Sequence, residues 1–245
     1  VSNAAFSLYG DQILTASADN TAKLWDATSG KLIASFAHQA AVYNAMFSPD
    51  GVQILTASAD TTAKLWDAAS GKLIGSFDHQ DEVFQAAFSP DGARILTVSA
   101  DKTAKLWEAA SGRLVVSFEH QANVYHGAFS PDSTRILTAS ADNAAKLWDA
   151  ASGKLIASFV HHDNIRSAAF SSDGARILTA SLDKTAKVWD AATPVELARQ
   201  LKESGGGAAR IDAPVSMTNS AALPVELLSA IASGLQFSSD GSLVA

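Results

Sequence analysis

The sequence predicts an all-β fold made of repeated four-stranded antiparallel sheets, and three observations support this prediction. First, all five tryptophans stand 41 residues apart, at Trp25, Trp66, Trp107, Trp148 and Trp189. Second, an aspartate stands six residues before each tryptophan, and a histidine stands 28 residues before each of the last four. Third, short apolar runs alternate with turn residues between these marks. A fixed period of this length indicates a repeat architecture.

The unit that begins at Val83 shows the predicted elements in order. A Ser-Pro-Asp-Gly turn at 89–92 follows the first strand, with Pro fixing φ at the second position and Gly closing the turn. Asp101 and Lys102 form a tight turn after the second strand. The turn at 110–112 ends in a glycine, which can adopt positive φ. The four predicted strands of this unit are 83–88, 94–99, 103–107 and 113–118.

One such sheet cannot bury both of its faces alone, because its strands are apolar on both sides. Radial stacking of sheets around an axis covers these faces and leaves only short edges, which predicts a β-propeller of four-stranded antiparallel blades. A solenoid is the rival architecture, but strand-rich units of this length favour the propeller. We expect five blades within residues 1–201 and the start of a sixth at 232–245, so that the ring is incomplete in this segment.

Composition limits the classes of function. The net charge of −7 argues against nucleic-acid binding and against an anionic membrane surface. The chain has no cysteine, which excludes disulfides, thiolate nucleophiles and cysteine-based zinc sites. No apolar run is long enough to span a bilayer, and no signal peptide is present. The chain starts and stops inside repeats, so we expect a segment of a longer protein, with a cytoplasmic location.

The repeat pattern breaks after Asp190. Residues 193–201 can form a short helix, with Thr193 as the N-cap and Pro194 at the first position, or a modified fourth strand. The segment 202–231 is predicted to be an insertion, partly flexible around three glycines and partly helical over 224–231. Residues 235–241 then resemble the first strand and turn of a new unit.

The pattern of His79, Thr97, Asp101 and Trp107 followed by Glu108 resembles the WD-repeat (tryptophan–aspartate) β-propeller family. The resemblance covers residues 1 to about 201 and is specific because it recurs at fixed spacing. The glycine that often precedes the family's histidine is absent, Glu108 replaces the usual aspartate, and the first unit lacks its histidine. High identity between units is more typical of bacterial members. A ring of this family usually has seven blades, and the propeller is often attached to an effector or signalling domain.

A hydroxyl, an imidazole and a carboxylate in one unit invite a catalytic-triad interpretation. However, an active site is normally built once, whereas this set occurs in four successive units. The resemblance implies a buried hydrogen-bond chain from Asp to His to Thr to the indole N–H, which joins the loop between blades to the tight turn. We therefore expect a structural network and no catalytic residue. The four sets are His38/Thr56/Asp60/Trp66, His79/Thr97/Asp101/Trp107, His120/Thr138/Asp142/Trp148 and His161/Thr179/Asp183/Trp189.

Two further interpretations of the repeated residues, a metal site formed by the histidines and a polyanion site formed by lysines, are not favoured. One histidine per blade cannot share a metal ion, because packed sheets lie about 10 Å apart and zinc needs ligands at about 2 Å. We therefore expect no metal and no cofactor. A lysine two residues before each tryptophan could form a polyanion site, but a lysine stem packed on the blade with a solvated or paired head is the favoured interpretation. These lysines are Lys23, Lys64, Lys105, Lys146 and Lys187.

The loops around the histidines vary between units, whereas the turns at the opposite end hardly change. Antiparallel strand order places the histidine loops and the aspartate turns at the same end. In the family that end is commonly the binding face, and the positions three and five after the histidine, with the residue before the turn aspartate, are its usual contacts. Three aromatics and an arginine there match the composition of binding hot spots. The contact residues predicted are Tyr43, Phe84, Tyr125, Arg166, Glu82, Asn123, Asn164 and Leu182.

These observations predict a non-enzymatic scaffold that binds a partner protein or peptide on the face carrying the histidine loops. An alternative is a small-ligand-binding or enzymatic propeller that uses the channel mouth around Arg166, where a carboxylate or phosphate would pair with the guanidinium. The aromatics could also simply fill the channel, or the insertion at 202–231 could itself be a docking arm. Exposed blade edges in an incomplete ring also predict a tendency to associate.

Overall fold

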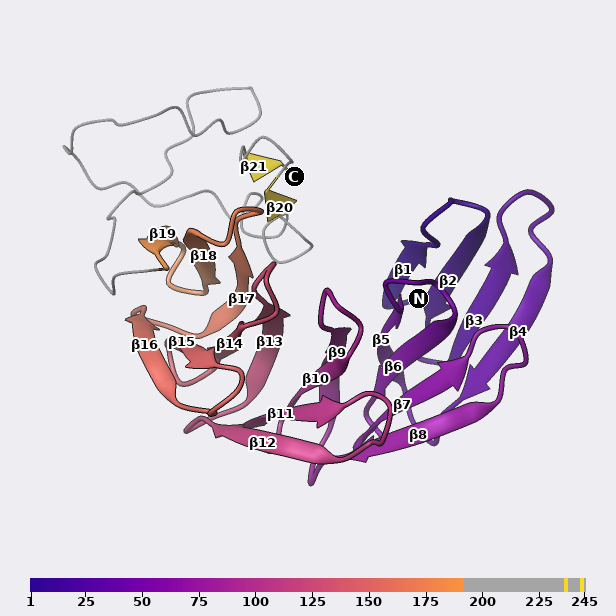
Figure 1. Ribbon diagram of the computed structural model, residues 1–245, viewed down its shortest axis with the longest axis horizontal. Coiled ribbons are helices and arrows are strands. Elements are labelled where there is room, and N and C mark those ends of the chain that lie inside the picture. Colours follow the sequence, from indigo (N-terminus) through magenta and orange to yellow (C-terminus); the bar gives the residue numbers. More distant parts are fainter. Residues whose placement is uncertain (192–235, 238–242, 245) are drawn as a thin grey trace. The chain divides into compact units, whose positions relative to one another are not determined.

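The computed structural model describes residues 1–191, 236–237 and 243–244, and within these residues it contains strands and no helix (Figure 1). The chain divides into two compact units, Val1–Gly127 and Ala128–Ala245. Each unit consists of short antiparallel sheets that follow one another in sequence order. The all-β class and the succession of blade-like antiparallel sheets confirm the predicted fold class.

The first unit contains three four-stranded sheets with the strand orders β1-β2-β3-β4, β5-β6-β7-β8 and β9-β10-β11-β12. In each sheet the strands pair in chain order, so the first and fourth strands are the two edges. The strands are β1 (Asn3–Phe6), β2 (Gln12–Ala16), β3 (Thr21–Asp26), β4 (Leu32–Ala37), β5 (Val42–Phe47), β6 (Gln53–Ser58), β7 (Thr62–Asp67), β8 (Leu73–Asp78), β9 (Val83–Phe88), β10 (Arg94–Ser99), β11 (Thr103–Glu108) and β12 (Leu114–Glu119).

The boundary between the two units falls within β13, which is the first strand of the four-stranded sheet β13-β14-β15-β16. The second unit also contains one three-stranded sheet, β17-β18-β19. A further antiparallel pair, β20 with β21, joins Phe237 to Leu243. The predicted helices at 193–201 and 224–231 and the insertion at 202–231 lie outside the described residues. The strands are β13 (Val124–Phe129), β14 (Arg135–Ser140), β15 (Ala144–Asp149), β16 (Leu155–Val160), β17 (Ile165–Phe170), β18 (Arg176–Ser181), β19 (Ala186–Asp190), β20 (Gln236–Phe237) and β21 (Leu243–Val244).

The turn between the second and third strands has the same construction in each sheet, as β6 and β7 show. The Ser58 hydroxyl accepts a hydrogen bond from the Asp60 N–H, and the Asp60 carboxylate accepts from the Thr62 N–H. Between them, Thr61 adopts a φ of 70°. This left-handed conformation suits Asn20 and Asn143 at the equivalent positions, but it strains a β-branched residue.

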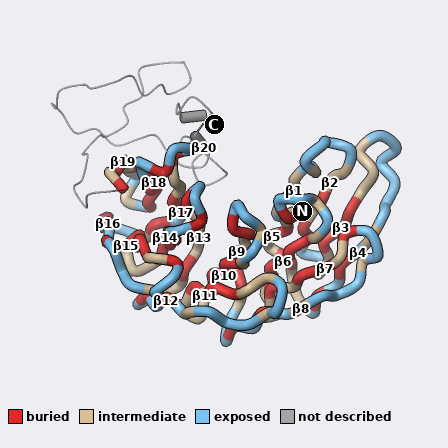
Figure 2. Tube along the Cα trace, viewed as in Figure 1, coloured by how far each residue is buried: buried red, intermediate tan, exposed pale blue. Residues whose placement is uncertain are grey.

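Hydrophobic cores form between successive sheets. One cluster joins Leu14, Leu24 and Phe36 of the first sheet to Ile54 and Trp66 of the second. The Phe36 and Trp66 rings lie 5.5 Å apart between centroids, and the same pairing recurs as Phe77–Trp107 at 5.4 Å and Phe159–Trp189 at 5.0 Å. The buried residues lie mainly on the inner strands of each sheet, whereas fourth strands such as β8 and β12 are largely exposed (Figure 2). Trp66, Trp107 and Trp189 therefore each belong to a core shared by two blades.

Candidate functional site

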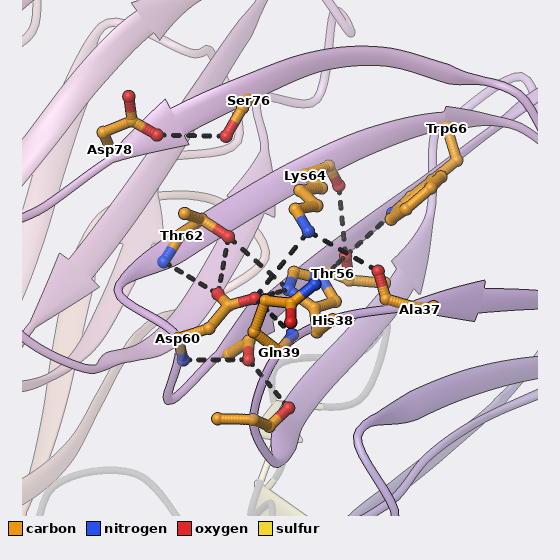
Figure 3. Close-up of polar contacts among 12 residues, drawn as sticks. Ala37, His38, Gln39, Thr56, Asp60, Thr62, Lys64, Trp66, Ser76 and Asp78 are labelled. Carbon is orange, nitrogen blue, oxygen red and sulfur yellow. Dashed lines mark hydrogen bonds and ion pairs between the residues drawn. The ribbon is translucent and has the colours of Figure 1, made fainter.

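A hydrogen-bonded chain runs from Asp60 through His38 and Thr56 to Trp66 (Figure 3). The Asp60 Oδ2 and His38 Nδ1 atoms lie 2.8 Å apart, and His38 Nε2 lies 2.7 Å from the Thr56 hydroxyl. The Trp66 Nε1–H donates to the same hydroxyl over 2.9 Å. Asp60 Oδ2 also accepts from the Gln39 N–H, so the carboxylate joins the histidine loop to the tight turn.

The protonation states of Asp60 and His38 fix which atom donates in each of these hydrogen bonds. Burial alone would raise the pKa of Asp60, but bonds from Thr62, Gln39 and His38 outweigh it and lower the pKa to about 2. Burial lowers the pKa of His38 more than Asp60 raises it, so this imidazole is neutral at pH 7. A carboxylate can only accept, so His38 Nδ1 carries the proton and Nε2 accepts the Thr56 O–H. Every donor in the chain then has an acceptor.

The same geometry recurs in two further described sets. His79 Nδ1 lies 2.7 Å from Asp101 Oδ2, and its Nε2 lies 2.7 Å from the Thr97 hydroxyl, to which Trp107 donates. In the second unit the corresponding chain consists of Asp183, His161, Thr179 and Trp189. Trp148 likewise donates to Thr138 over 2.9 Å. His120 belongs to the first unit and Asp142 to the second, so their joining remains a prediction.

These sets are not arranged for catalysis. The side chains of His38 and His79 are 0% exposed, and Thr56 and Thr97 are also fully buried. A substrate therefore cannot reach the hydroxyl or the imidazole. The geometry instead satisfies buried polar groups and holds a loop in place. Among the described residues, no group of three or more His, Cys, Asp or Glu is placed to hold a metal ion.

Four of the repeated lysines lie over the tryptophan ring of their own strand: Lys64, Lys105, Lys146 and Lys187. Lys64 Nζ lies 5.8 Å from the centre of the Trp66 ring and 3.7 Å from Asp60 Oδ2. Lys105 lies 5.8 Å from Trp107 and donates to the Asp78 carbonyl over 2.9 Å. Their stems cover apolar surface while their charged heads have partners. This arrangement supports the packed-stem interpretation over a polyanion site.

The predicted contact aromatics of the first unit form a continuous row. The Tyr43 and Phe84 rings lie 6.0 Å apart with an interplanar angle of 38°, and Phe84 and Tyr125 lie 5.5 Å apart at 39°. All three side chains are half-buried, and they come from the second positions of β5, β9 and β13. Strands 41 residues apart thus place their variable side chains against one another, a contact that the sequence period alone did not specify.

Glu82 adds a carboxylate to this row. The Tyr43 hydroxyl donates to Glu82 Oε2 over 3.0 Å, across two successive blades. Burial and the neighbouring Glu82 carboxylate raise the pKa of Tyr43. Asn123 is half-buried at the equivalent position one repeat later. In the second unit Asn164 is half-buried, Arg166 is exposed on β17 and Leu182 is 46% exposed.

Sequence reasoning missed a second contact between successive blades, which lies beside the aromatic row. The side-chain carbonyl of Gln85 accepts from the Gly127 N–H over 2.9 Å, and Asn3 and Asn44 similarly accept from Ala45 and Ala86. These amides satisfy N–H groups on the edge of the next first strand. The sequence does carry an amide residue at this position in several repeats. The repeat period alone, however, does not show which group that residue contacts.

The comparison with known families agrees with this geometry. The family described as "WD domain, G-beta repeat" matches residues 1–26, 30–67, 71–108, 112–149 and 153–190. The chain therefore belongs to the WD-repeat family of β-propeller repeat proteins. Members generally act as non-enzymatic scaffolds for protein–protein interaction. No curated protein matches this chain. No helix among the described residues is long and apolar enough to cross a membrane.

Proposed function

We propose that this protein is a scaffold that binds a partner protein or peptide on the face carrying the histidine loops. In the first unit Tyr43, Phe84 and Tyr125 are the anchors, and Glu82 and Asn123 add polar specificity. In the second unit the proposed contact residues are Asn164, Arg166 and Leu182. The observation that carries the proposal is the row of three half-buried aromatics at positions that vary between otherwise similar repeats.

The hydrogen-bond chains and the aromatic row contribute to binding in different ways. The hydrogen-bond chains hold the histidine loops rigidly, so side chains on this face are presented without a large loss of conformational entropy on binding. Half-buried aromatic rings contribute apolar area on contact and have few rotatable bonds. Aromatic side chains and arginine are also enriched at binding hot spots. A rigid face with variable aromatic residues is suited to selecting a partner.

The proposal is tested by affinity capture from the native cell lysate. The wild-type chain is compared with a Tyr43→Ala, Phe84→Ala, Tyr125→Ala triple variant and with a Val52→Ala control. Val52 is a 56% exposed apolar residue in the turn at the opposite end of the strands. Circular dichroism must first show that all three proteins are folded.

We expect partners that are retained by wild type and by Val52→Ala and lost by the triple variant. Equal recovery with all three proteins would mean that the aromatic row only fills space between blades. The site would then have to be sought elsewhere in the chain.

A further inference from the structure

The carboxylates beside the aromatic row lack the ion-pair partners that the turn aspartates at this end of the first unit have. Asp19, Asp60 and Asp101 each have a lysine or histidine partner. Asp78, Asp81 and Glu82 have no ion-pair partner among the described residues. The Glu82 side chain has one polar contact in the described part of the chain, the Tyr43 hydroxyl, so its second oxygen accepts no hydrogen bond there.

The cations at this end are already engaged or lie in another turn. Lys23, Lys64 and Lys105 lie against Asp19, Asp60 and Asp101. Lys102 is exposed in the tight turn next to Asp101. Residues 1–127 as a whole hold 13 aspartates and glutamates against 8 lysines and arginines. The aromatic row therefore borders an acidic loop whose carboxylates lack a counter-ion.

The Tyr43 ring is suited to a cation in two respects. It ends the aromatic row, because the small residue Ser2 stands at the equivalent position one repeat earlier and adds no further ring. Its hydroxyl donates to a carboxylate, which increases the electron density of the ring. Electron-rich aromatic faces attract ammonium and guanidinium groups, and a nearby carboxylate adds a charge-assisted hydrogen bond.

We propose that Tyr43, Phe84 and Glu82 form a subsite for a cationic side chain, an arginine or lysine, of the bound protein or peptide. This inference rests on the proposed function, because it assigns a partner chemistry to the same face. The cation would stack on the aromatic surface and pair with the free oxygen of Glu82. Asp78 and Asp81 supply longer-range attraction for a basic partner.

The test uses fluorescence anisotropy with the whole chain and two fluorescein-labelled glycine–serine peptides. One peptide carries arginines, and the other carries citrulline, a neutral side chain of nearly the same shape, at the same positions. Three variants accompany the wild type: Glu82→Gln, Tyr43→Leu and the control Asp11→Asn. Asp11 is an exposed aspartate in the turn at the opposite end of the strands, so its substitution removes the same charge away from the subsite.

We expect wild type to bind the arginine peptide about tenfold more tightly than the citrulline peptide, as one cation–aromatic contact with a paired carboxylate allows. Glu82→Gln and Tyr43→Leu should each remove most of this difference, and Asp11→Asn should leave it unchanged. Equal binding of the two peptides by wild type, no binding of the arginine peptide at millimolar concentration, or equal losses in Glu82→Gln and Asp11→Asn would overturn the subsite.

Failure of the subsite can be separated from failure of the proposed function. A captured partner that is lost by the aromatic triple variant and retained by Glu82→Gln would leave the binding face in place and refute the cation subsite. A partner retained by both variants would contradict the face as well.

Discussion

Val98 and Gly127 are a complementary pair across two successive blades. A Cβ built on Gly127 would lie 2.8 Å from Val98 Cγ1 and 2.8 Å from Leu96 Cδ2, closer than packed carbon atoms approach. The other repeats carry alanine at both positions, for example Ala57 with Ala86 in the neighbouring core. A larger residue on one blade is therefore matched by a smaller one on the next, and the volume of the core is kept.

This pairing predicts a non-additive effect on stability. Gly127→Ala should lower the free energy of unfolding by about 1–3 kcal/mol, because the methyl group overfills the core. Val98→Ala alone should destabilise by leaving a void, whereas the double variant recreates the alanine pair of the other repeats. We expect a coupling energy of roughly 0.5–3 kcal/mol from a denaturation cycle. Strictly additive effects would contradict the packing.

Breaking one hydrogen-bond chain should destabilise the fold without abolishing it. Asp101→Asn or His79→Ala leaves a buried partner unsatisfied, which predicts a loss of about 1–3 kcal/mol in urea denaturation. Gln80→Ala is the matched control, because this exposed neighbour contributes only its backbone N–H to Asp101. A denaturation midpoint of Asp101→Asn equal to that of wild type would show that the chain adds nothing to stability.

Stability should fall as the pH drops below about 6.5. Burial lowers the pKa of His38 and His79, so both take up protons at a lower pH in the folded state than in the unfolded chain, which takes them up near pH 6.5. The unfolded state then binds more protons, and each histidine contributes up to about 1.4 kcal/mol per pH unit. Denaturation curves between pH 7 and pH 5 measure this slope, and His79→Ala should reduce it. A slope that is zero, or unchanged by the substitution, would be inconsistent with buried neutral imidazoles.

The tight turns offer a stabilising substitution. Thr61 has a φ of 70°, which a β-branched residue adopts at a cost of about 1–2 kcal/mol. Thr61→Asn should raise the free energy of unfolding by roughly 0.5–1 kcal/mol, since asparagine already occupies this conformation at positions 20 and 143. The reverse change, Asn20→Thr, should lower it by a similar amount. Thermal unfolding of both variants measures the two changes in stability. Melting temperatures that shift in the same direction in both variants would contradict backbone strain at Thr61.

Much of the fold could be predicted because the same residues recur at the same spacing, so each repeat checks the interpretation of the others. The five tryptophans and their aspartates define the strands, and the resemblance to the WD-repeat family implied the hydrogen-bond chain through Thr56 and His38. Contacts between blades were harder to predict, since period alone does not say which side chains meet. The Phe36–Trp66 packing, the Gln85 amide bond to Gly127 and the Tyr43–Glu82 hydrogen bond therefore appeared only in the structure. The predictions for 192–235 concern residues outside the described part of the chain.

The most direct test of the binding face is site-specific photo-crosslinking. A benzophenone amino acid is placed at Phe84, in the middle of the aromatic row, or at Val52 in the opposite turn, and each protein is irradiated in the native lysate. We predict a discrete crosslinked partner from position 84 that position 52 does not give, and that an excess of unlabelled wild-type chain removes. The same products from both positions, or none from position 84, would contradict the claim that this face binds a partner.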